Sequence, residues 1–220
     1  MIKAVVFDMD GTIADSEKIA ERVTREFFQK RGIILTREEE KAMFGLNWKD
    51  LVKEILKSRG FEYKQNIKNT LKERYVRTMA REVKALPGVY DLLDEVSKNL
   101  KVGLATNSRH REVNIIFDKL DFHGYFHLKL ARDHVKKGKP DPEIYLKAAD
   151  TFGVKPFECV VFEDSIIGLL AAKTAGMKRV AIVNTYTREE LDKEADLVID
   201  SYKDINLSKI LKLGGEDFVQ

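Results

Sequence analysis

Five short apolar runs constrain the fold of this chain more than any other feature of its sequence. Turn-forming residues bound each run, and the runs are continuous rather than alternating, as expected of strands in a parallel sheet that is covered on both faces. Patterns typical of helices fill most of the intervals between them. The sequence therefore predicts a doubly wound α/β fold. The runs occupy residues 3–7, 101–106, 159–162, 179–183 and 195–199.

The predicted helices of this fold have apolar residues spaced three and four apart. Pro87 suits the first turn of the first helix, because the N–H that proline lacks would be unpaired there in any case. The tail after residue 199, which ends in GGEDFVQ, is predicted to be loosely held. The predicted helices cover residues 87–100, 111–121, 141–153, 165–176 and 188–195.

One long interval interrupts the alternation of strands and helices. It has helical periodicity but no convincing strand, and it carries two helix-start signals: a capping box formed by Thr36 and Glu39, and Asn47 ahead of an apolar pattern. We therefore expect a Rossmann-like, three-layer parallel-sheet core with an inserted all-helical domain. The predicted core comprises residues 1–15 and 85–220, the insert comprises residues 16–84, and the predicted hinges lie near residues 14–16 and 85–88.

Charge balance and segment length limit the partners of this chain. Charged residues form 34% of the sequence, against a typical value of about 25%, but the formal net charge is only +3. This balance gives no strong electrostatic case for binding nucleic acid or a membrane. The single cysteine, Cys159, excludes an internal disulfide framework, and no segment approaches the roughly 18 apolar residues of a membrane helix. We expect a soluble, cytoplasmic protein. The sequence does not determine its oligomeric state, and a monomer is compatible with it.

Polar side chains suited to catalysis follow three of the predicted strands. In open α/β sheets, ligands bind beyond the carboxyl ends of the strands, so we expect these side chains to converge on one edge of the sheet. Lys139 stands in a loop whose backbone is restricted by Pro140 and Pro142, and we expect it at the same edge. The side chains that follow the strands are Asp8 and Asp10, then Thr106, Asn107 and Ser108, and then Glu163 and Asp164.

The four carboxylates of this set predict a bound divalent cation. Hard oxygen ligands suit Mg²⁺, which binds a few carboxylates and keeps waters or substrate oxygens in its other positions. Without a cation, the clustered carboxylates would repel one another and raise one another's pKa values. With the cation present, Lys139 and Thr106 are free to bind an anion.

Each of these residues also has a simpler explanation when it is taken alone. Asp164 could cap the helix that follows it, Thr106 could be a turn residue, and Lys139 could be a solvated charge. The pattern DxDGT at residues 8–12 is more specific, because at average residue usage it arises by chance in roughly one chain of this length in several hundred. Its order with the other segments favours the catalytic interpretation.

Four segments of the chain resemble the motifs of a known family, the haloacid dehalogenase superfamily of phosphohydrolases. The resemblance spans nearly the whole chain and keeps the usual order of the motifs. The predicted helical insert directly after the first motif is similar to the cap domain of the branch that contains phosphoglycolate phosphatase and β-phosphoglucomutase. The four segments are DMDGT (8–12), LATNS (104–108), GKPDPE (138–143) and VVFEDS (161–166).

This resemblance implies a Mg²⁺-dependent phosphatase that hydrolyses a small phosphorylated metabolite, of the sugar phosphate or phosphoglycolate type, through an aspartyl phosphate. It implies that Asp8 is the nucleophile and that Asp10 protonates the leaving oxygen and then activates water. The implied Mg²⁺ ligands are Asp8, the backbone carbonyl of Asp10 and Asp164, with Glu163 as a further ligand or orienting group.

The resemblance also implies a set of groups that bind the phosphoryl oxygens. Side chains would supply the charge and the hydroxyl, and Lys139 would also hold the nucleophile in place. Backbone amides at the turn after the first strand would complete the cradle, because glycine allows close approach there. The residues of this set are Thr106, Asn107 and Lys139, with the amides of Met9 and Gly11.

A β-phosphoglucomutase-like phosphomutase is the main alternative, because it uses the same core motifs and differs in its cap. Such mutases usually have a His early in the first cap helix and an Arg in the cap loop that binds the second phosphate. Here the matching positions hold Ala20 and Trp48, which favours a phosphatase. Asn47, Trp48 and Lys49 are then the candidate substrate-facing residues of the cap.

Two other classes fit the sequence less well. Dehalogenases of the same superfamily need neither a metal nor an acid two residues after the nucleophile, so Asp10 and the acidic pair at residues 163–164 argue against them. A receiver-type phosphoacceptor domain has no cap, and it usually places its acceptor Asp on a middle strand. Repeated release of phosphate from acetyl phosphate would distinguish the phosphatase from such a domain.

Overall fold

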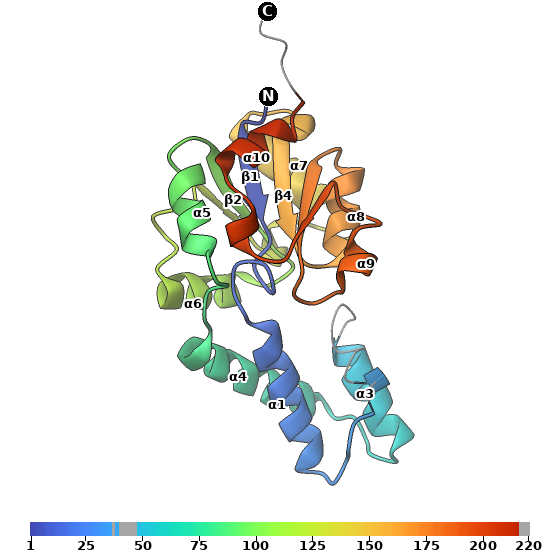
Figure 1. Cartoon of the computed structure of the whole chain (residues 1–220). Helices are drawn as coiled ribbons and strands as arrows, with labels where there is room; N and C mark the ends of the chain where they lie inside the picture. Colours follow the sequence, from blue (N-terminus) through green and yellow to red (C-terminus); the bar gives the residue numbers. More distant parts are fainter. Residues whose placement is uncertain (37, 40–47, 216–220) are drawn as a thin grey trace, which may run out of the picture.

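The computed structural model describes residues 1–36, 38–39 and 48–215, and within them the strands form one six-stranded sheet. All neighbouring strands are parallel, in the order β3-β2-β1-β4-β5-β6, so the chain starts in the middle of the sheet and extends to each side (Figure 1). The strands are β1 (Ala4–Phe7), β2 (Lys101–Ala105), β3 (Leu128–Leu130), β4 (Cys159–Glu163), β5 (Lys178–Ile182) and β6 (Leu197–Ile199).

Helices cover both faces of this sheet, which confirms the predicted three-layer α/β fold (Figure 1). The residues of β1 alternate between the two layers, because successive side chains of a strand point to opposite faces. Val5 and Phe7 pack with α5 and α10, whereas Ala4 and Val6 pack with α7 and α8. The helices of the core are α5 (Val89–Val96), α6 (His110–Leu120), α7 (Glu143–Phe152), α8 (Ile166–Thr174), α9 (Arg188–Leu191) and α10 (Leu207–Lys212).

The structure differs from the sequence-based prediction at one strand and at the tail. β3 was not predicted, because it has only three residues at the edge of the sheet and forms no recognisable apolar run. The predicted loose tail after residue 199 is wrong for its described part. A 3₁₀ helix (Tyr202–Asp204) and α10 follow, and Tyr202, Ile205 and Ile210 are buried in the core.

Between β1 and α5, the described residues form helices and connecting segments but no strand. The helical segment, defined as α1, α3 and α4, lies beyond the carboxyl end of β1 (Figure 1). Arg22 pairs with Glu82 and Arg74 pairs with Glu26, so two ion pairs join α1 to α4. Nowhere in the described part of the chain is a helix both long and apolar enough to cross a membrane. The segment comprises α1 (Glu17–Gln29), α3 (Trp48–Ser58) and α4 (Gln65–Glu82).

One of the two helix-start signals predicted in this interval is confirmed. The Thr36 N–H donates to Glu39 Oε2 at 2.9 Å, and the Glu39 N–H donates to Thr36 Oγ1 at 3.2 Å, which are the reciprocal bonds of a capping box. Asn47, the other signal, lies outside the described residues. The limits of an inserted domain at residues 16–84 stay a prediction.

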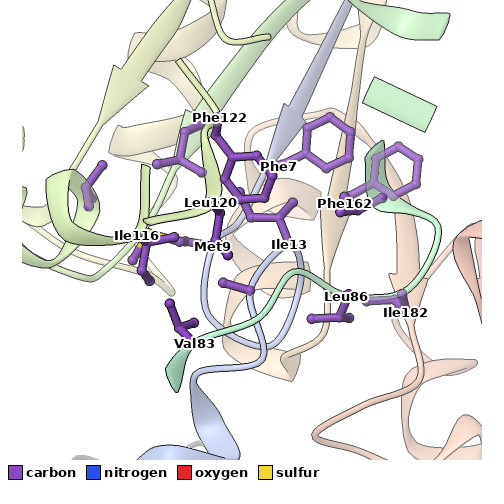
Figure 2. Close-up of a cluster of buried hydrophobic side chains, with 14 of the residues drawn as sticks. Phe7, Met9, Ile13, Val83, Leu86, Ile116, Leu120, Phe122, Phe162 and Ile182 are labelled. Carbon is purple, nitrogen blue, oxygen red and sulfur yellow. The ribbon is translucent and has the colours of Figure 1, made fainter. Parts of the chain in front are cut away.

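Two crossings connect the helical segment to the core, and they lie side by side. The Asp15 N–H donates to the Lys84 carbonyl at 2.9 Å, and the Leu86 N–H donates to the Ile13 carbonyl at 3.0 Å. Figure 2 shows Ile13, Val83 and Leu86 within the cluster of buried hydrophobic side chains near the end of β1. Both crossings are therefore anchored in the core, and hinge motion about them stays a prediction.

Candidate active site

Three carboxylates meet where β1 and β4 end. The two strands are neighbours, with Phe7 opposite Phe162, and the Asp8 N–H donates to the Phe162 carbonyl at 2.9 Å. Asp8 therefore emerges beside Glu163 and Asp164, and one carboxylate oxygen from each of the three lies within 4.8 Å of the other two. All three side chains are buried. The structure thus brings these predicted residues together at one edge of the sheet.

Lys139 supplies the positive charge of this acidic cluster. Its Nζ lies 2.6 Å from Asp8 Oδ1 and 2.6 Å from Glu163 Oε1. Burial alone would lower the pKa of Lys139, but the negative charges of Asp8 and Glu163 outweigh burial and raise it. Burial raises the pKa of Asp8 well above its ordinary value, although the charge of Lys139 opposes this shift. The ammonium group therefore stays charged and holds Asp8 in one orientation.

The loop that carries Lys139 is tied to the loop that follows β2. Asn107 Oδ1 accepts the Lys139 N–H at 2.9 Å, and Asn107 Nδ2 donates to the Lys139 carbonyl at 3.3 Å. A Cβ on Gly138 would lie 2.7 Å from Asn107 Oδ1, so glycine permits this close approach. Thr106 is buried, and its Oγ1 accepts the Ser108 N–H at 3.0 Å. Phosphate binding by Asn107 and Thr106 stays a prediction.

Asp10 is held by two hydroxyl groups from different parts of the chain. Ser16, just before α1, and Ser108, in the loop after β2, each donate to its carboxylate. Burial raises the pKa of Asp10, and the two hydroxyl donors only partly offset this effect. A carboxyl group with a raised pKa is suited to carry a proton to a leaving oxygen. Sequence reasoning missed Ser16, whose only signal is its place at the first crossing.

Asp164 faces the turn that follows β1. Thr12 Oγ1 donates to Asp164 Oδ1 at 3.2 Å, and Thr185, in the loop after β5, donates to Oδ2. Gly11 has a φ of 74°, and a Cβ there would lie 2.0 Å from Asp164 Oδ2, so this turn requires glycine. The Gly11 N–H donates to the Ala14 carbonyl at 2.9 Å. One of the two amides predicted to cradle phosphate is therefore already paired.

Two side chains of the helical segment lie near Asp10, and sequence reasoning missed both. Glu17 is the first residue of α1; burial raises its pKa to about 8, and the negative charges of Asp10 and Asp8 add to the shift. Tyr75 lies on α4; burial raises its pKa well above the ordinary value, and Asp10 and Glu17 add to the shift. Glu17 could have been found from its place directly after the first crossing. Nothing in the local pattern distinguishes Tyr75 from a core aromatic.

The remaining predicted residues are less defined by the structure. Asn47 lies outside the described residues. Trp48 and Lys49 begin α3, but their side chains lie outside the described part, so their contact with substrate stays a prediction. The Met9 side chain is buried in the cluster of Figure 2, and the role predicted for its backbone amide is untested.

Comparison with known proteins relates this fold and site to a family. A family model described as haloacid dehalogenase-like hydrolase matches residues 5–182. The phosphorylated carbohydrates phosphatase of Thermotoga maritima is 35% identical over 183 residues, which cover 81% of this chain and 84% of that protein. The β-phosphoglucomutase of Bacillus subtilis is 30% identical over 222 residues, which cover 94% of this chain and 92% of that protein. The crystal structure of CbbY from Rhodobacter sphaeroides in complex with phosphate is 30% identical, with a TM-score of 0.76 and coverage of 94% and 98%.

The chain belongs to the haloacid dehalogenase-like hydrolase family. It is a phosphoric monoester hydrolase that acts on phosphorylated compounds, as the four motifs implied. The predicted family and enzyme class are therefore confirmed, and the acidic cluster with Lys139 is the candidate site of the reaction.

Proposed function

We propose that this protein is a Mg²⁺-dependent phosphatase that hydrolyses a small phosphorylated metabolite through an aspartyl phosphate on Asp8. The buried contact between Lys139 Nζ and Asp8 Oδ1, at 2.6 Å, carries the proposal. A carboxylate that a fixed cation holds in one orientation is ready for in-line attack on phosphorus. The same ammonium group stabilises the negative charge of the transferred phosphoryl group.

The donor set of the acidic cluster fits a hard divalent cation. Asp8, Glu163 and Asp164 each offer an oxygen within 4.8 Å of the others. Burial raises the pKa values of Asp8 and Asp164, and neighbouring carboxylates add to both shifts, a repulsion that a cation would relieve. We assign Asp8, Asp164 and the carbonyl of Asp10 as ligands, with Glu163 as a further ligand or orienting group. Mg²⁺, when bound, supplies charge neutralisation for the transferred phosphoryl group.

The reaction then takes place in two steps that share one proton carrier. In the first step, an Asp8 oxygen forms a bond to phosphorus, the bond to the leaving oxygen breaks, and protonated Asp10 gives its proton to that oxygen. In the second step, the Asp10 carboxylate takes a proton from water and the resulting hydroxide attacks phosphorus. The bond between the Asp8 oxygen and phosphorus breaks, inorganic phosphate leaves, and the Asp8 carboxylate is restored. The raised pKa of Asp10 suits the first step. Lys139 and Thr106 bind the phosphoryl oxygens throughout.

We propose that the leaving group carries hydroxyls, as in a sugar phosphate. The charge of Asp10 contributes to the raised pKa of Glu17, about 8, so Glu17 lies near the proposed proton carrier and is largely uncharged at neutral pH; its carboxyl group can donate to and accept from a hydroxyl. The Thermotoga relative is named for phosphorylated carbohydrates, and a mutant of CbbY from Rhodobacter sphaeroides was crystallised with xylulose-(1,5)bisphosphate. Both names support this choice of substrate.

A phosphomutase is the second candidate, because the Bacillus subtilis β-phosphoglucomutase is 30% identical to this chain. A mutase must hold a bisphosphate while it reorients, which requires a cation for the distal phosphate. Ala20 on α1 supplies no such charge. We therefore prefer the phosphatase.

Replacing the nucleophile tests the proposed function. We expect Asp8→Asn to release no inorganic phosphate from a panel of sugar phosphates, because it keeps the size of the side chain and removes its nucleophilic charge. Asp118→Asn is the matched control, since Asp118 is exposed and paired with His123 at 2.8 Å. Continued turnover by Asp8→Asn, or full wild-type activity in excess chelator, would contradict the proposed function.

A further inference from the structure

Tyr145 lies beside the acidic cluster, and none of the steps described above uses it. It belongs to the first turn of α7 and is fully buried. Its hydroxyl donates to Glu163 Oε1 at 2.8 Å, and the centre of its ring lies 4.7 Å from Lys139 Nζ. Tyr145 therefore contacts both members of the Glu163–Lys139 ion pair.

Glu163 is held from several sides. Its Oε1 accepts hydrogen bonds from Lys139 and Tyr145, and its Oε2 accepts the Ser165 N–H at 3.2 Å and the Ser165 hydroxyl at 2.8 Å. A Cβ on Gly168 would lie 1.8 Å from Glu163 Oε1, so α8 packs directly against the carboxylate. The carboxylate therefore has little space in which to turn.

The position of Glu163 determines the position of Lys139. An ammonium group has three donors, and Lys139 directs two of them to Asp8 Oδ1 and Glu163 Oε1, each at 2.6 Å. A shift of Glu163 Oε1 would pull Nζ with it and change the orientation of Asp8. The three residues thus form a chain of contacts that ends on the proposed nucleophile.

We propose that Tyr145 is a positioning residue that fixes Glu163 and, through it, keeps Lys139 Nζ on Asp8. Tyr145 itself does not touch the reacting atoms. This inference rests on the proposed function, because it adds a second layer to the same site. Its physical basis is the hydrogen bond to a charged acceptor in a buried, closely packed position, where water cannot easily replace the lost hydroxyl.

Tyr145→Phe tests the inference, because it removes the hydroxyl and keeps the ring over Lys139. We expect kcat to fall roughly tenfold while KM changes by less than about twofold, since the lost hydrogen bond orients the nucleophile and does not bind substrate. Tyr90→Phe is the matched control: the Tyr90 hydroxyl donates to the Leu120 carbonyl at 2.7 Å, at the end of α6. A merely structural role would lower the melting temperature of both variants and leave kcat unchanged in both.

A crystal structure of Tyr145→Phe separates this inference from the proposed function. We expect Lys139 Nζ to leave hydrogen-bond distance of Asp8 Oδ1 or Glu163 Oε1. If both contacts persist, or if Tyr145→Phe has the kcat of the wild type, Tyr145 is not a positioning residue, although the phosphatase function stands. If the wild type releases no phosphate, the proposed function fails, and the positions of Nζ in the two structures still decide whether Tyr145 orders the cluster.

Discussion

Replacing Lys139 with Met removes the only cation in contact with Asp8 and Glu163 among the described residues, and it keeps much of the side-chain length. In the wild type, the side chain of Lys139 is 2% exposed, and those of Asp8 and Glu163 are 10% and 1% exposed. In the metal-free variant these two carboxylates are buried without a positive partner. We therefore expect a large loss of stability near neutral pH.

The size of this loss follows from the burial of the pair. Removing one partner of a buried ion pair costs about 3–5 kcal/mol. Protonation of Asp8, whose pKa burial already raises, offsets part of this cost in the variant. We therefore expect a loss at the lower end of the range, about 3 kcal/mol. In a chain of this size, 1 kcal/mol shifts the melting temperature by roughly 2–4 °C. We expect Lys139→Met to melt roughly 6–12 °C below the wild type at about pH 8.

The pH dependence of this loss has a definite sign. Without Lys139, burial holds the folded-state pKa of Asp8 still further above its value in the unfolded chain, so the folded state binds more protons. Stability from such a group is fully present below the unfolded pKa and is lost as the pH rises through the folded pKa. The difference in melting temperature between variant and wild type should therefore grow from about pH 5 to about pH 8.

Thermal unfolding followed by circular dichroism in excess chelator measures both effects. Lys173→Met is the control, because Lys173 Nζ pairs with Glu194 Oε2 at 3.0 Å but the lysine side chain is 53% exposed. Exposed pairs contribute about 0–1 kcal/mol, so the control should melt within roughly 4 °C of the wild type. If Lys139→Met melts with the control at both pH values, the ammonium group is not the counter-charge of the acidic cluster.

Two further predictions concern Glu17, which lies near Asp10, and the type of reaction. The folded-state pKa of Glu17, about 8, exceeds its ordinary value of 4.5, so wild-type stability falls as the pH rises between them. Glu17→Gln should therefore melt above the wild type at about pH 8 and close to it at about pH 4.5, and equal melting at both would show that the pKa of Glu17 is not raised. With β-glucose 1-phosphate and a trace of glucose 1,6-bisphosphate, free phosphate should exceed glucose 6-phosphate, because Ala20 provides no cation for a distal phosphate. Rapid conversion to glucose 6-phosphate with little free phosphate would instead establish a mutase.

The core of the site was predictable because its polar residues come directly after the ends of strands. Asp8, Glu163 and Asp164 stand directly after continuous apolar runs, and parallel strands bring their carboxyl ends to one edge. Lys139 was predictable only through its motif, because a lysine in a loop is otherwise indistinguishable from a surface charge. The pattern and composition of the apolar runs thus predicted the sheet, and the motifs predicted the polar residues at its edge.

The contacts made across the fold could not be predicted in this way. Ser16 donates to Asp10, Thr185 donates to Asp164, and Tyr75 lies near Asp10. These three residues belong to segments whose placement depends on tertiary packing. Tyr145 fits the apolar pattern of α7, so its sequence context indicates only a core aromatic. The buried residues after β6 were missed for the same reason: Tyr202, Ile205 and Ile210 alternate with polar residues, and their burial appears only when the tail lies against the sheet.

Acid quenching during turnover, followed by mass spectrometry, would locate any phosphoryl group bound to the protein. We expect a phosphorylated peptide that contains Asp8, and we expect hydroxylamine to remove the phosphoryl group, because hydroxylamine cleaves acyl phosphates. The modification should be absent from Asp8→Asn. Phosphate release that continues with no phosphorylated Asp8, or with the phosphoryl group on another residue, would contradict a mechanism through an aspartyl phosphate at this position.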